Sequence, residues 1–191
     1  MTKAIIFDCF GVIITDSLRS IVKEVRKNDP DKANHILDLV SAASKGKIDA
    51  RLSRQAVASE LGLTHDEYVS AIRNGEVKNK PLLAYIKELR SRYKTALLSN
   101  IISGGLEARF PNNELSNYFD VVVASSNIGF AKPEARAYEI TAEKLGVRLD
   151  ECIMVDDVEA YCLGAEGVGM QAIRYQSFDQ MKNELEVLLK L

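Results

Sequence analysis

The sequence has few residues of the kinds that stiffen, loosen or cross-link a chain. Of its 191 residues, 4 are proline, 11 are glycine, 3 are cysteine and none is tryptophan. This composition excludes a collagen-like or low-complexity chain, and it excludes a small fold that depends on disulfides. A hydrophobic share of 47% and a charged share of 27% instead indicate a globular protein that buries a core of its own.

The sequence also lacks long apolar runs and an excess of charge. No apolar run approaches the roughly 20 residues needed to cross a bilayer, and Asp8 interrupts the first apolar stretch, unlike in a signal peptide. The 25 basic and 27 acidic residues leave a formal net charge of -2, which favours neither nucleic acid nor an anionic membrane as a partner. We therefore expect a cytoplasmic protein that binds neither, and its oligomeric state stays open.

The three cysteines do not suggest thiol chemistry. Cys9, Cys152 and Cys162 are odd in number and have no zinc-binding or redox spacing, which indicates reduced thiols. A catalytic cysteine needs a base nearby, and the only histidines, His35 and His65, lie in predicted surface helices. We expect Cys9 to be buried and inert.

Apolar runs that are typical of strands alternate with helical patterns along most of the chain. Residues 3–14 indicate a strand buried on both faces, followed by its exit loop. Four similar runs follow, at residues 95–99, 121–125, 152–155 and 171–175. Helical patterns at residues 81–93 and 133–145 each begin with a proline. Strands that alternate with single helices predict an α/β fold with a doubly wound, mainly parallel sheet.

The strand pattern disappears between residues 16 and 79, and helical patterns replace it. Thr64–Glu67 form a capping box that begins a fourth helix in this interval, and Asn74–Gly75 end it. We therefore predict two domains. Residues 1–15 and 80–191 form the α/β core, and residues 16–79 form an inserted helical cap of four helices.

Polar residues stand at the ends of the predicted strands. Asp8 ends the first strand, Ser99–Asn100 end the second, Asp156–Asp157 end the fourth, and Lys132 precedes the helix after the third. Open α/β sheets bind ligands outside the carboxyl ends of their strands. Three carboxylates gathered there would repel one another unless a cation lay among them, and oxygen ligands suit Mg²⁺. A lysine and a hydroxyl nearby complete a site for a phosphoryl group.

These residues also produce a resemblance to a known family. The segments Asp8–Val12, Leu98–Asn100, Lys132–Glu134 and Val155–Asp157 resemble the four ordered motifs of the haloacid dehalogenase superfamily. The similarity is greatest to the branch that contains small sugar-phosphate phosphatases and 2-haloacid dehalogenases. Members of that branch have a Rossmann-like core and a helical cap inserted after the first motif, which matches the predicted insertion.

The resemblance implies a Mg²⁺-dependent phosphatase that acts on a small phosphorylated metabolite. Asp8 would be the nucleophile and would form an aspartyl phosphate that water hydrolyses. Asp8, the backbone carbonyl of Phe10 and Asp157 would bind Mg²⁺, and Asp156 would assist through a water molecule.

The resemblance also assigns the residues around the phosphoryl group. Ser99 and the amide of Asn100 would hold the phosphoryl oxygens, and Lys132 would neutralise charge on both Asp8 and the phosphate. A carboxylate near a phosphate dianion is repelled by roughly 4 kcal/mol per pair of unit charges near a protein surface. The lysine and the metal would offset that repulsion.

Phe10 departs from the family pattern, which usually has a second aspartate at this position to protonate the leaving group. Phenylalanine donates no proton, and the loss of a general acid typically costs on the order of 10² to 10⁴ in rate. We therefore expect a substrate whose leaving group departs unprotonated, such as an acyl phosphate, a phosphoanhydride or an anomeric sugar phosphate. Val158 and Tyr161 replace residues that are usually small or polar in the family.

Three alternatives stay open. A metal-independent 2-haloacid dehalogenase would use the same Asp8 to displace halide, although the Asp156–Asp157 pair disfavours it. The changes at Phe10, Val158 and Tyr161 are compatible with a binding protein that has lost most catalysis. A receiver domain of two-component signalling also phosphorylates an aspartate, but its acidic pair comes first and its lysine last.

The predicted cap has no recognisable specificity motif. Four residues in it have side chains able to bind a ligand, namely His35, Arg51, Arg54 and His65. Charged residues on helices are usually solvated, so the sequence does not distinguish among them.

Overall fold

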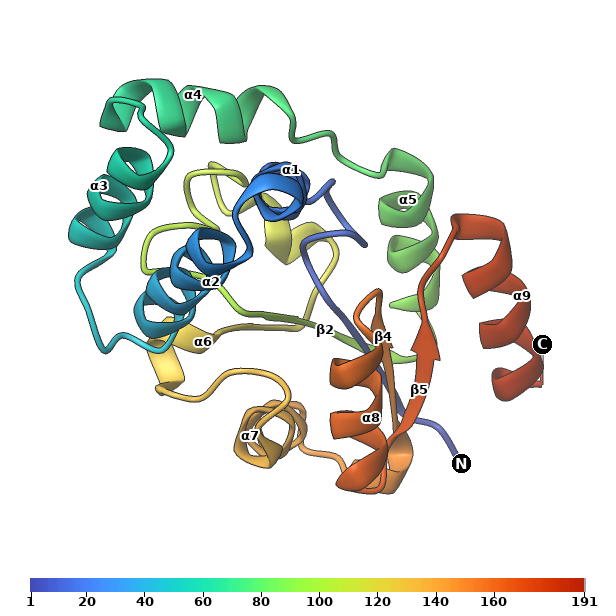
Figure 1. Ribbon diagram of the computed structural model, residues 1–191. Coiled ribbons are helices and arrows are strands. Elements are labelled where there is room, and N and C mark those ends of the chain that lie inside the picture. Colours follow the sequence, from blue (N-terminus) through green and yellow to red (C-terminus); the bar gives the residue numbers. More distant parts are fainter. Residues whose placement is uncertain (191) are drawn as a thin grey trace.

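A computed structural model describes residues 1–190 and has a five-stranded parallel sheet at its centre (Figure 1). The strands are β1 (Ala4–Phe7), β2 (Lys94–Ser99), β3 (Val121–Ala124), β4 (Cys152–Asp156) and β5 (Gln171–Arg174). Their order in the sheet is β3-β2-β1-β4-β5. The predicted doubly wound α/β fold is confirmed. The strand order changes direction between β1 and β4, so the residues after these two strands lie at the switch point where such sheets bind ligands.

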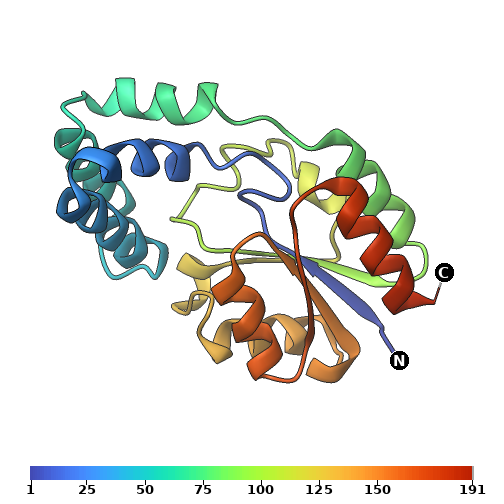
Figure 2. The ribbon, with the colours of Figure 1, turned by 45° about the vertical axis from the view of Figure 1, so that its right-hand side comes forward.

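Helices cover both faces of the sheet. Figure 2 shows α5 (Lys80–Leu89) and α9 (Phe178–Leu189) on one face, and α7 (Ala135–Leu145) and α8 (Glu159–Gly167) on the other. Side chains of β1 alternate between the faces: Ile5 and Phe7 belong to the core under α5 and α9, and Ala4 and Ile6 to the core under α7 and α8. Burial on both faces explains why the first strand is apolar throughout.

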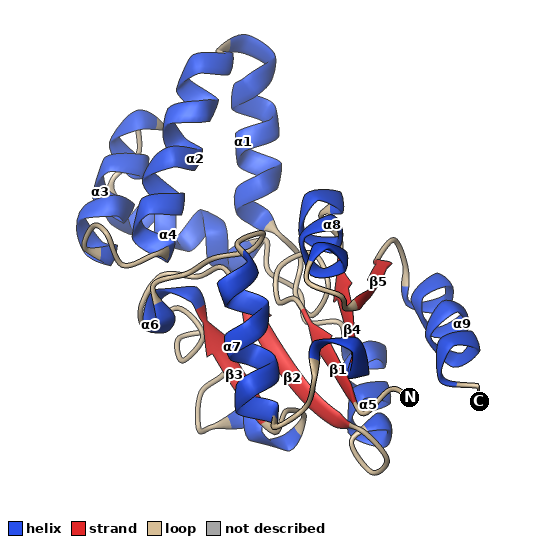
Figure 3. Cartoon of the chain, turned by 90° about the horizontal axis from the view of Figure 1, so that it is seen from below, coloured by secondary structure: helices blue, strands red, loops and turns tan. Residues whose placement is uncertain are grey.

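Four further helices lie between β1 and α5 in the chain and form a separate group, which we call the cap (Figure 3). They are α1 (Ser17–Asn28), α2 (Pro30–Ser44), α3 (Ala50–Glu60) and α4 (His65–Asn74). Each begins at a side-chain cap, and α4 has the predicted capping box between Thr64 and Glu67. The cap has its own buried core: Val22, Ala33, Ile36, Val57, Ala58, Tyr68 and Ile72.

The chain enters and leaves the cap at one place. The amide of Thr15 donates to the carbonyl of Val77 at 3.1 Å, and the amide of Asn79 donates to the carbonyl of Ile13 at 2.8 Å. The hydroxyl of Thr15 donates to the carbonyl of Gly75 at 2.6 Å and accepts the amide of Val77 at 2.8 Å. The two connecting segments are therefore joined side by side.

Several helix ends differ from the predicted ones. Helix α7 begins at Ala135 instead of residue 133, and α5 begins at Lys80 and ends at Leu89, earlier than residue 93. Ser125, expected at the end of a strand, begins the short helix α6 (Ser125–Ile128), where its hydroxyl donates to the carbonyl of Ser44 at 2.5 Å. Two 3-10 helices, Glu114–Asn117 and Leu149–Glu151, were not predicted. No helix within residues 1–190 has the length and apolar character needed to cross a membrane.

Candidate active site

Three carboxylates meet at the switch point of the sheet. Asp8 follows β1, Asp156 ends β4 and Asp157 comes next, and one oxygen from each lies within 4.8 Å of the others. Asp8 and Asp156 are buried. Buried carboxylates this close destabilise one another when ionised unless positive charge lies nearby. The donor set, which consists only of oxygen atoms, suits a hard cation such as Mg²⁺.

Gly11 allows the loop after β1 to approach this cluster. Its φ is +88°, in the left-handed region, and a Cβ built there would lie 2.3 Å from Oδ2 of Asp157. Any side chain at this position would displace the Asp157 carboxylate. The loop after β1 and the loop after β4 are therefore packed against each other through a glycine.

Lys132 supplies one positive charge to the cluster. Its Nζ donates to Oδ1 of Asp8 and to Oδ2 of Asp156, both at 2.6 Å, and its side chain is fully buried. Burial lowers the pKa of Lys132, but the attraction of Asp8 and Asp156 outweighs burial and raises the pKa above its ordinary value. The lysine is therefore a permanent cation between the two carboxylates.

One lysine does not balance the cluster. Burial raises the pKa of Asp8 to about 7, Lys132 opposes that shift, and repulsion from Asp156 adds to it. A second cation would favour the ionised form of Asp8. The buried acids thus fit a divalent metal ion that would be held by Asp8 and Asp157.

Ser99 and Asn100 end the neighbouring strand and have different partners. The side chain of Asn100 binds the backbone of Lys132, donating to its carbonyl and accepting from its amide, both at 2.8 Å. Asn100 thus orients the lysine. The hydroxyl of Ser99 is buried and has no hydrogen-bond partner among residues 1–190. A buried hydroxyl of this kind can donate to an anion that enters the site.

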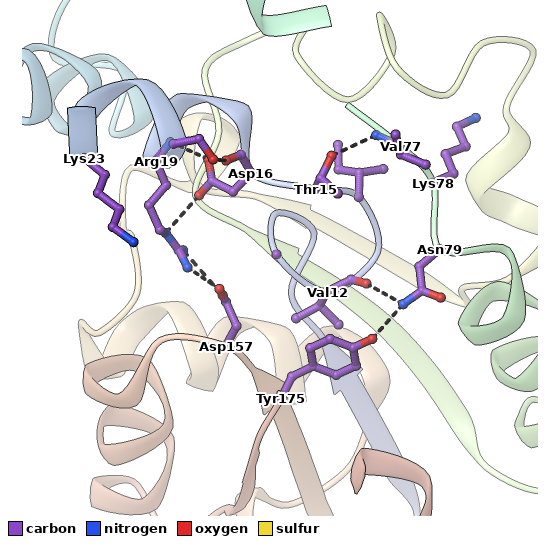
Figure 4. Close-up of a pocket in the computed structure, with 13 residues that line it drawn as sticks. Val12, Thr15, Asp16, Arg19, Lys23, Val77, Lys78, Asn79, Asp157 and Tyr175 are labelled. Carbon is purple, nitrogen blue, oxygen red and sulfur yellow. Dashed lines mark hydrogen bonds and ion pairs between the residues drawn. The ribbon is translucent and has the colours of Figure 1, made fainter. Parts of the chain in front are cut away.

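Arg19, on the first turn of α1, reaches across to the cluster and was not singled out in the sequence. Figure 4 shows its guanidinium between Asp16 and Asp157. Nη1 of Arg19 forms an ion pair with Oδ2 of Asp157, and Nε lies 3.2 Å from Oδ2 of Asp16. A cap residue therefore contacts one of the expected metal ligands.

Arg109 was also missed, and it lies over the ring of Phe10. Its Cζ is 5.1 Å from the ring centroid. Its Nε and Nη2 donate to Oε1 of Glu76 at 2.8 and 2.5 Å, and its Nη1 donates to the carbonyl of Gly105 at 2.9 Å. Because Arg109 and Glu76 come from distant segments without strand-end positions, no sequence pattern indicated the pair.

A cavity of about 740 Å³ lies between the cap and the sheet. Its core side includes Asp8, Phe10, Asn100 and Lys132, together with Val158 and Tyr161. Its cap side includes Leu37, Arg54 and Tyr68. A second cavity of about 580 Å³ lies against the connecting segments and shares Asp16, Arg19 and Lys23 with the first (Figure 4). The larger cavity has the size of a small-molecule site.

Two phosphatases with known names are similar to parts of this chain. A 58-residue stretch of the chain, 30% of it, is 45% identical to 27% of a phosphatase from Mycobacterium tuberculosis. A 107-residue stretch, 56% of the chain, is 27% identical to 57% of the fructose-1-phosphate phosphatase of Escherichia coli. These alignments span less than two thirds of either relative's own length.

Solved structures share the fold. A haloacid dehalogenase family enzyme from Bacteroides thetaiotaomicron, in complex with magnesium and inorganic phosphate, superposes with a TM-score of 0.74. The match covers 93% of this chain and 96% of that chain at 22% identity. The family model for haloacid dehalogenase-like hydrolases matches residues 2–169. The chain belongs to the haloacid dehalogenase-like hydrolase family.

Proposed function

We propose that the chain is a Mg²⁺-dependent phosphatase of a small phosphorylated metabolite and that Asp8 is its nucleophile. The observation on which this depends is the buried Lys132, whose ammonium group bridges Asp8 and Asp156 at the core side of the cavity. A cation in this position lowers the repulsion between a carboxylate and an incoming phosphate dianion. The phosphatases among the relatives and the magnesium and phosphate in the Bacteroides enzyme support the same function.

The reaction would proceed in two displacements at phosphorus. An oxygen of Asp8 attacks the phosphorus atom, the bond to the leaving-group oxygen breaks, and that oxygen departs with the electron pair. Water then attacks the aspartyl phosphate, and the bond between phosphorus and the Asp8 oxygen breaks. Inorganic phosphate is released, and the carboxylate of Asp8 is regenerated.

The neighbouring residues would orient and neutralise the phosphoryl group. The hydroxyl of Ser99 and the backbone amide of Asn100 would donate hydrogen bonds to its oxygens, and Lys132 would offset its charge. Asp8, Asp157 and the carbonyl of Phe10 would hold Mg²⁺, which supplies further positive charge when bound. Asp156, whose oxygens accept hydrogen bonds from Lys132 and the amide of Val158, would assist the metal through a water molecule.

Phe10 decides the kind of leaving group. Its side chain lines the cavity and donates no proton, so the favoured substrates are an acyl phosphate, a phosphoanhydride or an anomeric sugar phosphate. A leaving oxygen in these compounds is stable without immediate protonation. Simple alkyl phosphates need a proton at that oxygen and should react more slowly.

The test is release of inorganic phosphate from these three classes and from alkyl phosphates, with Mg²⁺ or with EDTA, and Asp8→Asn is the blank. We expect turnover of at least one activated class, loss of that turnover in EDTA, and none with Asp8→Asn. Activity that survives in Asp8→Asn would refute the mechanism. Faster turnover of alkyl phosphates would refute the assignment of the leaving group.

A 2-haloacid dehalogenase is the second candidate, and one observation favours it. Arg19 neutralises Asp157 through an ion pair, which lessens the need for a metal ion beside Asp8. Release of chloride from 2-chloroacids in EDTA, without phosphate release from any phosphorylated compound, would establish this alternative.

A further inference from the structure

The wall of the larger cavity contains more bases than acids. Its three acidic residues each already form an ion pair: Asp8 with Lys132, Asp16 with Arg19, and Glu76 with Arg109. Lys45, another base in the wall, pairs with Glu134. Three bases remain without an acidic partner among residues 1–190, namely Lys23, Arg26 and Arg54. The cavity therefore has positive charge beyond what its own acids balance.

Arg54 differs from the other two unpaired bases. Lys23 and Arg26 are exposed on α1, where water solvates them. Arg54 is half-buried on α3, and its Nε is buried without any hydrogen-bond partner among residues 1–190. A guanidinium N–H removed from water and left unpaired destabilises the folded state unless a ligand accepts its hydrogen. The cavity beside it is the space in which such a ligand would lie.

The surroundings of Arg54 suit an anion. Tyr68 lines the same cavity and has a hydroxyl able to donate; burial raises its pKa, and the charges of Arg109 and Arg54 oppose that shift. The planar guanidinium matches the two oxygens of a carboxylate or a phosphate. Arg54 comes from the cap, whereas Asp8 and Lys132 come from the edge of the sheet. An anion at Arg54 would therefore be held from the cap, whereas Lys132 beside Asp8 would hold a group from the sheet.

We propose that the substrate has a second anionic group, a carboxylate or a second phosphate, and that Arg54 binds it. This inference rests on the proposed phosphatase function. The reacting phosphoryl group lies against Lys132 at the core side of the cavity, and the second anion lies against Arg54 at the cap side. A substrate of this kind bridges the cap and the core.

The test uses three anomeric phosphates that differ at one carbon: glucose 1-phosphate, glucuronic acid 1-phosphate and glucose 1,6-bisphosphate. Phosphate release gives kcat/KM for each, and isothermal titration with the Asp8→Asn protein gives Kd without turnover. We expect at least about tenfold tighter binding and faster turnover for one of the charged compounds, the effect of a charge-assisted contact. A preference for glucuronic acid 1-phosphate would identify the second anionic group as a carboxylate, and a preference for glucose 1,6-bisphosphate would identify it as a phosphate.

Variants then assign the preference to Arg54. Arg54→Ala should reduce binding of the charged compounds to the level of glucose 1-phosphate and leave glucose 1-phosphate itself unchanged. Arg54→Lys should restore part of the preference. Arg51→Ala is the matched control, because Arg51 is exposed on the same helix and does not line the cavity.

Outcomes separate this inference from the proposed function. The role of Arg54 would be overturned if the protein bound the three compounds equally or bound none of them. It would also be overturned if Arg54→Ala weakened the binding of glucose 1-phosphate as much as the binding of the charged compounds. The phosphatase assignment would stand in that case if phosphate release still required Asp8. Charge-selective binding that depends on Arg54, without phosphate release from any compound, would keep the anion site and overturn the phosphatase.

Discussion

At the scale of single residues, Phe10 and Arg109 determine which groups the loop after β1 presents to the larger cavity. The ring occupies the position at which the family resemblance led us to expect an acid, and the guanidinium of Arg109 lies over it. Arg109 has five N–H bonds, and three of them donate to Glu76 and Gly105. Phe10 therefore offers no proton, and the guanidinium over its ring is held in place by Glu76 and Gly105.

Phe10→Asp tests this interpretation. The new carboxyl group would supply a proton to the leaving oxygen, so turnover of alkyl phosphates should rise by about tenfold or more relative to anomeric sugar phosphates. The ratio of kcat/KM for the two classes is the measurement, and Phe10→Asn is the control that adds polarity without an acid. An unchanged ratio would show that the leaving group is not limited by protonation.

The three cysteines provide a second prediction at this scale. Cys9, Cys152 and Cys162 are all buried, and burial raises the pKa of Cys152 to about 12. Thiolate is the reactive form, so a raised pKa and lack of access both suppress reaction. We expect almost no thiol labelling of the native protein by a disulfide reagent at pH 8 and three labelled thiols after denaturation. Rapid labelling of Cys9 in the native state would contradict its assignment as an inert core residue.

Strand-end residues were predictable because the sequence pattern determines where they lie. A buried strand has a recognisable apolar run, and the residue after it lies at the ligand-binding edge, so Asp8 and Asp156 were expected together. Lys132, expected with them from its place before the next helix, lies between the two. Arg19 and Arg109 depend on how the cap and a loop pack against the sheet. No periodicity in the sequence encodes that packing, which explains why both were missed.

At the scale of elements, helix α1 links the cap to the carboxylate cluster. Asp16 caps the helix by accepting the amide of Arg19 at 2.8 Å, which orients the first turn. Arg19 on that turn then pairs with Asp157 (Figure 4). Because Asp157 is also an expected metal ligand, the guanidinium and Mg²⁺ would compete for one carboxylate.

Arg19→Ala should therefore increase the affinity for Mg²⁺, by about tenfold for the loss of one charge-assisted contact. Isothermal titration of MgCl₂ into the metal-free protein measures this affinity directly. Lys27→Ala removes one positive charge from the same helix away from the cluster and should leave the affinity within about twofold, because that residue pairs with Glu24 on the surface. Weaker Mg²⁺ binding in Arg19→Ala would mean that the arginine supports the site instead of competing for it.

The periodicity of apolar residues predicted which segments are helices and their order along the chain, but it did not predict where several of them begin and end. The proline at residue 133 suggested a first turn, yet α7 begins at Ala135 because Glu134 before it is extended, with φ -64° and ψ 128°. The extended residue thus delays the helix. A backbone conformation of this kind is invisible to a pattern based on neighbouring residues.

At the scale of the whole molecule, the cap and the sheet have separate hydrophobic cores. Ile36 is buried among cap residues only, whereas Ile86 is buried in the core that contains β1 and β2. Polar pairs around the cavity connect the two parts, such as Arg19 with Asp157 and Lys45 with Glu134. The two parts should therefore lose structure independently.

Ile36→Ala should destabilise the cap by about 2–5 kcal/mol, the usual cost of such a deletion in a core. Hydrogen exchange followed by mass spectrometry should show faster exchange in α1 to α4 and unchanged protection in β1, β2 and β4. Ile86→Ala is the matched variant, and it should accelerate exchange in the sheet. Loss of protection in both parts upon Ile36→Ala would show that the protein unfolds as one unit.

The paired segments at Thr15 and Val77 have a consequence for how such proteins diversify. Because the chain leaves the sheet and returns to it at adjoining points, the insertion can be exchanged for another of different length without altering the path of the core. Gene recombination at this junction would preserve the loops at the carboxyl ends of the strands and replace the cap side of the cavity. The junction thus allows new substrate ranges to evolve around one reaction centre.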